Sequence, residues 1–145
     1  MVTRILAATS RRLRKRQEGQ AIVEFALIAP IFLLLVFGVV EFGRAWNVYQ
    51  TLTDAVREGA RTAAVANPAV TVDTVAARMN ANMYSAGLDT ASAIKTLTGF
   101  RAGTGTLVRV TIAYPYQLRW LSPFLGWTGA QAQLNMNSDV AFRNE

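Results

Sequence analysis

The sequence predicts an α+β fold, in which a long N-terminal helix precedes a second short helix and a small antiparallel β-sheet of about three strands. Three observations support this prediction. An apolar run ending at Val40 passes into a stripe of apolar residues at helical spacing. A short amphipathic segment follows at 72–86, and beyond it apolar and polar residues alternate with the period of two that is typical of half-buried strands.

The first half of the long helix is expected to cross a membrane. No residue from Phe25 to Val40 is charged, and Ala21, Ile22 and Val23 extend the run upstream, so only Glu24 interrupts it. About 20 predominantly apolar residues span a bilayer. A charged side chain within the bilayer costs roughly 2.5–3.5 kcal/mol on insertion scales. Glu24 is therefore either a functional residue with a partner or a residue that reaches the interface near one end of the span.

The segment before the apolar run is strongly basic. Residues 1–19 hold six basic residues and one acidic residue, and thus carry +5 of the formal net charge of +6. This asymmetry predicts that the N-terminus stays in the cytoplasm and the remainder crosses the membrane. A secretory signal peptide is disfavoured, because the run exceeds an h-region of roughly 7–15 residues and no A-x-A cleavage site follows. The basic segment is short and lacks interleaved aromatic residues, so no nucleic-acid partner is expected.

The long helix is expected to continue past Val40 to Ala66, where Asn67-Pro68 ends it. A heptad-like stripe supports this continuation; it consists of Phe42, Ala45, Tyr49, Leu52, Val56, Gly59 and Ala63. The stripe fits docking on the protein's own C-terminal domain or on a neighbouring subunit. Pro30 leaves the carbonyl of Ala26 without its helical donor, which predicts a kink or local melting, either tolerated in a membrane helix or used as a hinge.

The C-terminal part is expected to form the second helix and the sheet. The helix runs from Val72 to Ala86, with Thr71 as its N-cap and Gly87 as its stop. Two strands are predicted at 108–114 and 134–142, and a weaker one at 93–100. The connection at 115–130 is rich in aromatic residues. It either binds a partner or covers an undersized core; the candidate partner-binding residues are Trp120, Phe124 and Trp127.

The residue inventory does not favour an enzyme. The chain has no Cys and no His, which removes Ser-His and Cys-His catalytic sites and the usual zinc ligand sets. The acidic residues outside the membrane are scattered singly, without a calcium-loop pattern or a close pair suited to glycoside hydrolysis. We therefore expect no enzymatic activity, no cofactor and no catalytic or metal site.

The residues from Gly19 to Phe25, GQAIVEF, resemble the G-x-x-x-x-E-[FY] processing site of type IV pilins and pseudopilins. Beyond this motif, the segment EFALIAPIFLLLVFGVVEFGRAWNVYQTLTDAVREGARTAAV is similar to the N-terminal region of TadE-like proteins, minor pilins (pseudopilins) of the tight-adherence (Tad/Flp) type IV pilus system. The C-terminal pattern, with YPYQL and LSPFLG before a last strand, is more weakly similar. The resemblance implies a pilin-like fold and a role in assembling an adhesive pilus.

The resemblance also implies roles for single residues. A prepilin peptidase would cut between Gly19 and Gln20, which divides the chain into a cleaved cytoplasmic leader (1–19), a long helix (20–66) and an α+β domain (67–145). Gln20 and Glu24 are four residues apart on a helix, so the new terminal amine and the carboxylate can neutralise each other, within one subunit or between two. The Glu24-Phe25 pair, where major pilins of this system typically have Glu-Tyr, favours a minor component.

The implied location is the bacterial inner membrane, crossed once, with the C-terminal domain in the periplasm or, after processing, in the extracellular pilus. The implied partners are the prepilin peptidase, the other pilus subunits, the inner-membrane assembly platform and the lipid bilayer. An uncut, single-pass, membrane-anchored periplasmic binding or scaffold protein is the alternative.

Overall fold

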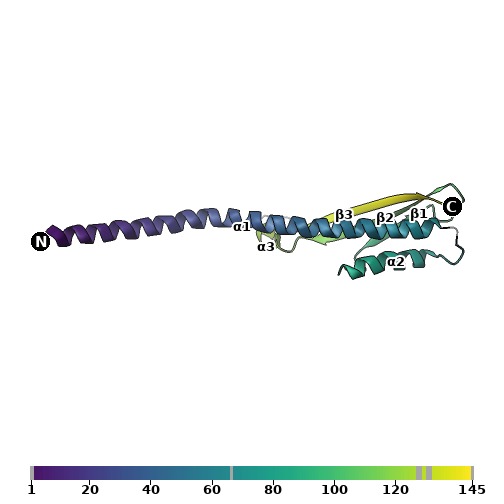
Figure 1. Ribbon diagram of the computed structural model, residues 1–145, viewed down its shortest axis with the longest axis horizontal. Coiled ribbons are helices and arrows are strands. Elements are labelled where there is room, and N and C mark those ends of the chain that lie inside the picture. Colours follow the sequence, from purple (N-terminus) through teal and green to yellow (C-terminus); the bar gives the residue numbers. More distant parts are fainter. Residues whose placement is uncertain (1, 66, 127–128, 130–131, 145) are drawn as a thin grey trace. The chain divides into compact units, whose positions relative to one another are not determined.

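The computed structural model describes residues 2–65, 67–126, 129 and 132–144. Along the chain, its elements are α1 (Val2–Ala64), α2 (Val72–Ser85), β1 (Ile94–Thr98), β2 (Leu107–Gln117), α3 (Ser122–Leu125) and β3 (Gln133–Arg143) (Figure 1). The strands form one antiparallel sheet in the order β1-β2-β3. The predicted α+β fold, with a long apolar helix, a short second helix and a three-stranded sheet, is confirmed.

The chain divides into two compact units, Met1–Val39 and Val40–Glu145. The division falls inside α1, because the second half of this helix packs with the residues that follow it. α1 begins at Val2 rather than at residue 20, so the segment predicted as a leader is helical here, and α1 ends at Ala64, two residues before the predicted boundary. The division at residues 19 and 66 that the family resemblance implies stays a prediction.

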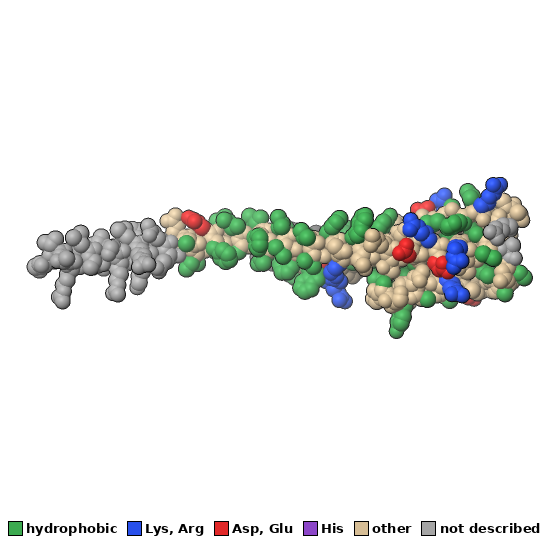
Figure 2. All heavy atoms as spheres, in the orientation of Figure 1, with side chains coloured by type: hydrophobic (Ala, Val, Ile, Leu, Met, Phe, Trp, Pro, Cys, Tyr) green, Lys and Arg blue, Asp and Glu red, His purple; other side chains and the backbone are tan. Residues whose placement is uncertain are grey.

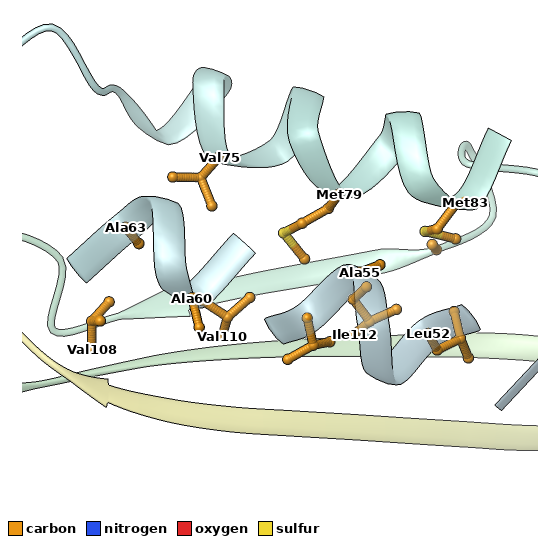
Figure 3. Packing of buried hydrophobic residues seen from close by; sticks show 12 residues of the cluster. Leu52, Ala55, Ala60, Ala63, Val75, Met79, Met83, Val108, Val110 and Ile112 are labelled. Atoms are coloured by element: carbon orange, nitrogen blue, oxygen red, sulfur yellow. The ribbon is translucent and has the colours of Figure 1, made fainter. Parts of the chain in front are cut away.

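The core of the C-terminal unit is a single cluster that joins α1, α2 and β2. The cluster also includes Ala93, the residue before β1. Its members are Leu52, Ala55, Val56, Ala60, Ala63, Val75, Met79, Met83, Ala93, Val108, Val110 and Ile112. Figure 3 shows Val75, Met79 and Met83 projecting from α2 toward the other elements of this cluster. Burial of such aliphatic side chains is the main driving force for folding of a small domain.

Small residues on α1 let the elements approach closely. A Cβ added at Gly59 would lie 2.7 Å from Cγ of Met79, and 3.5 Å from Cγ1 of Val110. The part of the stripe around Gly59 therefore docks on the protein's own C-terminal unit. This is one of the two predicted interpretations of the stripe. The first part of the stripe behaves differently, since Phe42 and Tyr49 are exposed. Phe42 and Tyr49 thus do not dock on the protein's own unit, and Glu41 is buried at that level instead. Contact of these two residues with a neighbouring subunit stays a prediction.

The local signals for α2 are confirmed. The hydroxyl of Thr71 accepts a hydrogen bond from the backbone N–H of Thr74 (3.2 Å), and the Thr74 side chain accepts one from the Thr71 backbone. This capping box satisfies amide groups that the first helical turn leaves free. After the helix, Gly87 has φ +72°, a conformation that glycine adopts without steric cost.

β2 is the central strand and pairs on both sides. Ile94 to Thr98 of β1 pair with Ala113 to Arg109, while β3 pairs with the whole of β2, from Leu107↔Arg143 to Gln117↔Gln133. The turn between β1 and β2 begins at Gly99, where an added Cβ would lie 2.1 Å from the carbonyl oxygen of Leu107. Only glycine fits this approach.

Candidate functional site

The predicted processing motif lies on α1. Gly19, Gln20 and Glu24 are exposed, and an added Cβ at Gly19 would have no neighbour within 4 Å. The side-chain amide Nε2 of Gln20 donates a hydrogen bond to Oε1 of Glu24 at 3.0 Å. Residues 20 and 24 thus lie within hydrogen-bonding reach on one helical face. In this uncut chain the donor is the side-chain amide, and the pairing with a terminal amine stays a prediction.

The apolar stretch after the motif exposes almost all of its large side chains. Phe25 is 73% exposed, and Figure 2 shows hydrophobic side chains over the visible face of this part of α1. Within the described residues, one helix is long and apolar enough to cross a membrane, α1 from Gly19 onward. Soluble monomers rarely expose so large an apolar surface. The finding indicates a membrane anchor.

Pro30 lies inside α1, and the helix assignment runs through it without interruption. The proline still removes one backbone donor from the helix. Its predicted role as a kink stays a prediction.

Glu41, directly after the apolar stretch, is a buried carboxylate that the sequence analysis did not single out. Its side chain is 2% exposed. The hydroxyl of Tyr116 donates a hydrogen bond to Oε1, and the backbone N–H of Trp120 donates one to Oε2 at 2.8 Å. Nη1 of Arg44 lies 4.0 Å from Oε1. Glu41 thus joins α1 to the end of β2 and to the turn that follows, with both oxygens hydrogen-bonded, as a buried charge requires.

The surroundings of Tyr116 change the pKa of its hydroxyl. Burial, and then the hydrogen bond to Glu41, raise the pKa of its hydroxyl to about 12. The group therefore stays protonated and keeps its donor role at neutral pH. The sequence did carry one weak signal for this cluster, since Glu41 and Arg44 have the i, i+3 spacing of neighbours on a helix.

The turn after β2 contains α3, which the sequence did not predict. Trp120 is 50% exposed and Phe124 is half-buried, and neither belongs to the buried core. Among the described aromatic residues of this connection, Trp120 and Phe124 therefore lie outside the core, whereas Tyr116, at the end of β2, is buried. Trp127 lies outside the described residues. A partner-binding role for Trp120, Phe124 and Trp127 stays a prediction.

Two arginines line a cavity beside the Glu41 cluster. The cavity has a volume of about 410 Å³, and Arg44, Arg119 and Tyr116 are among its lining residues, together with the carboxylate residue Asp89. The side chain of Arg44 is 41% exposed and its contact with Glu41 is loose. The cavity can therefore present guanidinium groups to an anion.

Aromatic side chains follow on the outer surface of α1. The rings of Phe42 and Trp46 are stacked with centroids 6.3 Å apart, and the rings of Trp46 and Tyr49 lie 6.2 Å apart. All three side chains are exposed. In the part of the chain that the structure describes, no three His, Cys, Asp or Glu residues gather as metal ligands.

Comparison with known proteins identifies the N-terminal region. Residues 19–61 match the family model of TadE-like protein, and the match covers the predicted processing motif, the apolar stretch and most of the buried part of α1. No curated protein and no solved structure matches the chain. The predicted family is confirmed: residues 19–61 form a TadE-like segment, which indicates a protein associated with the tight-adherence pilus and other pilus components.

Proposed function

We propose that this protein is a minor pilin, or pseudopilin, of a tight-adherence pilus, and that it acts in assembly rather than in catalysis. The observation that carries the proposal is the position of the family match, which starts at Gly19 and includes the Gly19-to-Phe25 motif. The exposed apolar stretch after the motif suits a subunit that is held first by lipid and later by neighbouring subunits.

In the proposed pathway, a prepilin peptidase cleaves the peptide bond between Gly19 and Gln20 on the cytoplasmic side. Both residues are exposed, and because the bond lies within α1, the helix must unwind locally for cleavage. Cleavage removes the basic leader, which carries +5 of the net charge, and leaves a nearly neutral protein. It also creates an ammonium group on Gln20, one helical turn from Glu24.

Glu24 then has two successive partners in this proposal. Before cleavage it accepts the side-chain amide of Gln20. After cleavage, the carboxylate neutralises a terminal amine, because an unpaired charge surrounded by apolar helices is costly. An amine of a neighbouring subunit would set the register of the incoming subunit within the filament. The other pilus subunits and the assembly platform are the partners in this step, and the C-terminal unit faces the periplasm or the outside.

The test is the intact mass and N-terminal residue of membrane-extracted protein, co-expressed with its prepilin peptidase. Wild-type protein should begin at Gln20, and Gly19→Leu should remain uncut. Gly38→Leu is a matched control, because Gly38 also lies on α1 with no neighbour within 4 Å of an added Cβ, and it should be cut normally. Uncut wild-type protein would overturn the proposal and favour a permanently anchored periplasmic binding or scaffold protein.

Glu24→Gln separates cleavage from assembly. This variant should be cut at Gln20 like the wild type, but it should be lost from sheared pili, as followed by immunoblot. Asp54→Asn is the control, because Asp54 is an exposed carboxylate on the same helix outside the apolar stretch, and it should be incorporated normally. Normal incorporation of Glu24→Gln would contradict the proposed role of the carboxylate.

A further inference from the structure

The buried carboxylate of Glu41 holds a distant segment of the chain beside the end of the apolar run. Ala21 to Val40 provide the 20 residues needed for a span, so Glu41 comes directly after the hydrocarbon core. Its Oε2 accepts the backbone N–H of Trp120, 79 residues further along the chain. Trp120 is thereby held beside Glu41, the first residue after the apolar run.

The residues around this point have the composition of a membrane interface. Trp120 is half exposed although its backbone is fixed, and Phe42 and Trp46 are exposed on α1 within the next two turns. Trp and Tyr are enriched at the headgroup level, where a ring can meet both apolar and polar surroundings. An exposed tryptophan costs less in this layer than in water.

Two cationic side chains lie at the same level. Arg44 is four residues past Val40, about 6 Å along a helix, which corresponds to the headgroup layer. Arg119, next to Trp120, lines the same cavity of about 410 Å³. Guanidinium groups bind phosphate through paired hydrogen bonds.

We propose that the segment from Arg119 to Leu125 is a second membrane contact, in which Trp120 lies in the headgroup layer and Arg44 and Arg119 bind lipid phosphate. Glu41 is the positioning residue that holds this segment at the correct depth. The contact rests on the membrane span of α1, and it is independent of cleavage after Gly19 and of assembly into a pilus.

The absence of cysteine from the sequence allows a direct depth measurement. The full-length chain receives a single spin-labelled cysteine by one of three substitutions: Val36→Cys in the span, Ser122→Cys at the start of α3, or Ala102→Cys in the exposed turn between β1 and β2. The protein is reconstituted in vesicles of phosphatidylethanolamine and phosphatidylglycerol. Accessibility to oxygen relative to a water-soluble nickel chelate then reports the depth of each label.

The label at residue 36 should be deep, the label at 122 should lie in the headgroup layer, and the label at 102 should be fully aqueous. The oxygen-to-nickel ratio at 122 should exceed that at 102 several-fold. An aqueous label at 122 together with a deep label at 36 would overturn the proposal and leave the membrane span intact. An aqueous label at residue 36 would contradict both the proposed membrane contact and the membrane span. The result at 36 thus distinguishes the two failures.

Variants then test the positioning role. Glu41→Ala should make the label at 122 aqueous, whereas Glu41→Gln should largely keep it in place, because the amide oxygen still accepts the Trp120 N–H. Arg119→Ala should lower the oxygen-to-nickel ratio at residue 122, and Arg119→Lys should restore it. The same results are expected in vesicles of phosphatidylcholine, whose lipids carry phosphate but no net charge. If Glu41→Ala leaves the ratio at 122 unchanged while near-UV circular dichroism shows a native fold, the positioning role is wrong.

Discussion

α1 contains two apolar stretches that differ in what covers them. From Ile22 to Val40 the apolar side chains are mostly large, namely Ile, Leu, Phe and Val, and they are exposed. From Leu52 to Ala63 most are small, namely Ala, Gly and Val, and they are buried under α2 and β2. Large side chains suit a fluid neighbour that fills the space around them, while small ones suit a rigid neighbour that must come close. The size of the apolar residues, more than their number, distinguishes a surface for lipid from a surface for protein.

The largest expected effect compares a leucine from each stretch. Leu52 is fully buried, so Leu52→Ala should lower the unfolding free energy of the C-terminal unit by about 2–5 kcal/mol through lost contacts and a cavity. Leu35 is 62% exposed, and Leu35→Ala should change it by less than about 0.5 kcal/mol. Denaturant unfolding in detergent, followed by near-UV circular dichroism, measures both. Equal losses would show that the two stretches share one folding unit.

The Glu41 cluster, between the two stretches, should make stability depend on alkaline pH. The hydroxyl of Tyr116 has a raised pKa of about 12 against an ordinary value of 10.0. Its contribution is therefore complete below about pH 10 and is lost as the pH rises toward about 12, because the unfolded chain ionises first. The loss should be about 1–3 kcal/mol. The free energy of unfolding, measured against pH for wild type and Tyr116→Phe, isolates this contribution as the difference between the two proteins. Parallel curves of unfolding free energy against pH would contradict the assignment.

The glycines of the two stretches should respond with opposite signs. Gly59→Ala should destabilise the C-terminal unit by about 1–3 kcal/mol, since the new methyl group would meet Met79 at 2.7 Å. Gly38→Ala meets nothing within 4 Å, and should stabilise α1 by about 0.5–1 kcal/mol through reduced backbone entropy of the unfolded chain. Thermal unfolding reports the first change, and hydrogen exchange of the amides around residue 38 reports the second. A stabilising Gly59→Ala would mean that Met79 moves aside freely.

The smallest effect is expected in the exposed aromatic group of α1. Trp46 is 54% exposed, so Trp46→Ala should change the unfolding free energy by no more than about 0.5 kcal/mol. Thermal unfolding monitored by circular dichroism at 222 nm suffices. A loss comparable to that of Leu52→Ala would place Trp46 in the packed region and move the boundary between the stretches.

Much of the fold could be predicted because its signals are local. Thr71 and Gly87 bound α2, and the alternation of apolar and polar residues fixes β2 and β3. The predicted strand ends before Pro115, whereas β2 continues to Gln117. β1 pairs no further than Ala113, so this part of β2 has β3 as its only paired neighbour and tolerates a residue without an N–H.

The candidate site was predictable only in part. The motif from Gly19 to Phe25 and the span are contiguous in the sequence, and the family match covers both. The role of Glu41 was not predictable, because its partners Tyr116 and Trp120 are brought to it by the tertiary fold across 75 and 79 residues. For the same reason, the helical spacing that placed Phe42 and Tyr49 in the heptad-like stripe could not reveal that Glu41 is buried at that level.

The pairing of β2 with β3 also determines when the protein can fold during its synthesis. The stripe from Leu52 to Ala63 leaves the ribosome long before Val110 and Ile112, which cover it. The sheet can be completed only once β3 is available, and Asn144, directly after β3, donates side-chain hydrogen bonds to the carbonyl oxygen of Gly99 and the hydroxyl of Thr106. Contacts so distant in sequence form slowly. The newly made chain therefore exposes this apolar stripe until α2 and β2 have been synthesised.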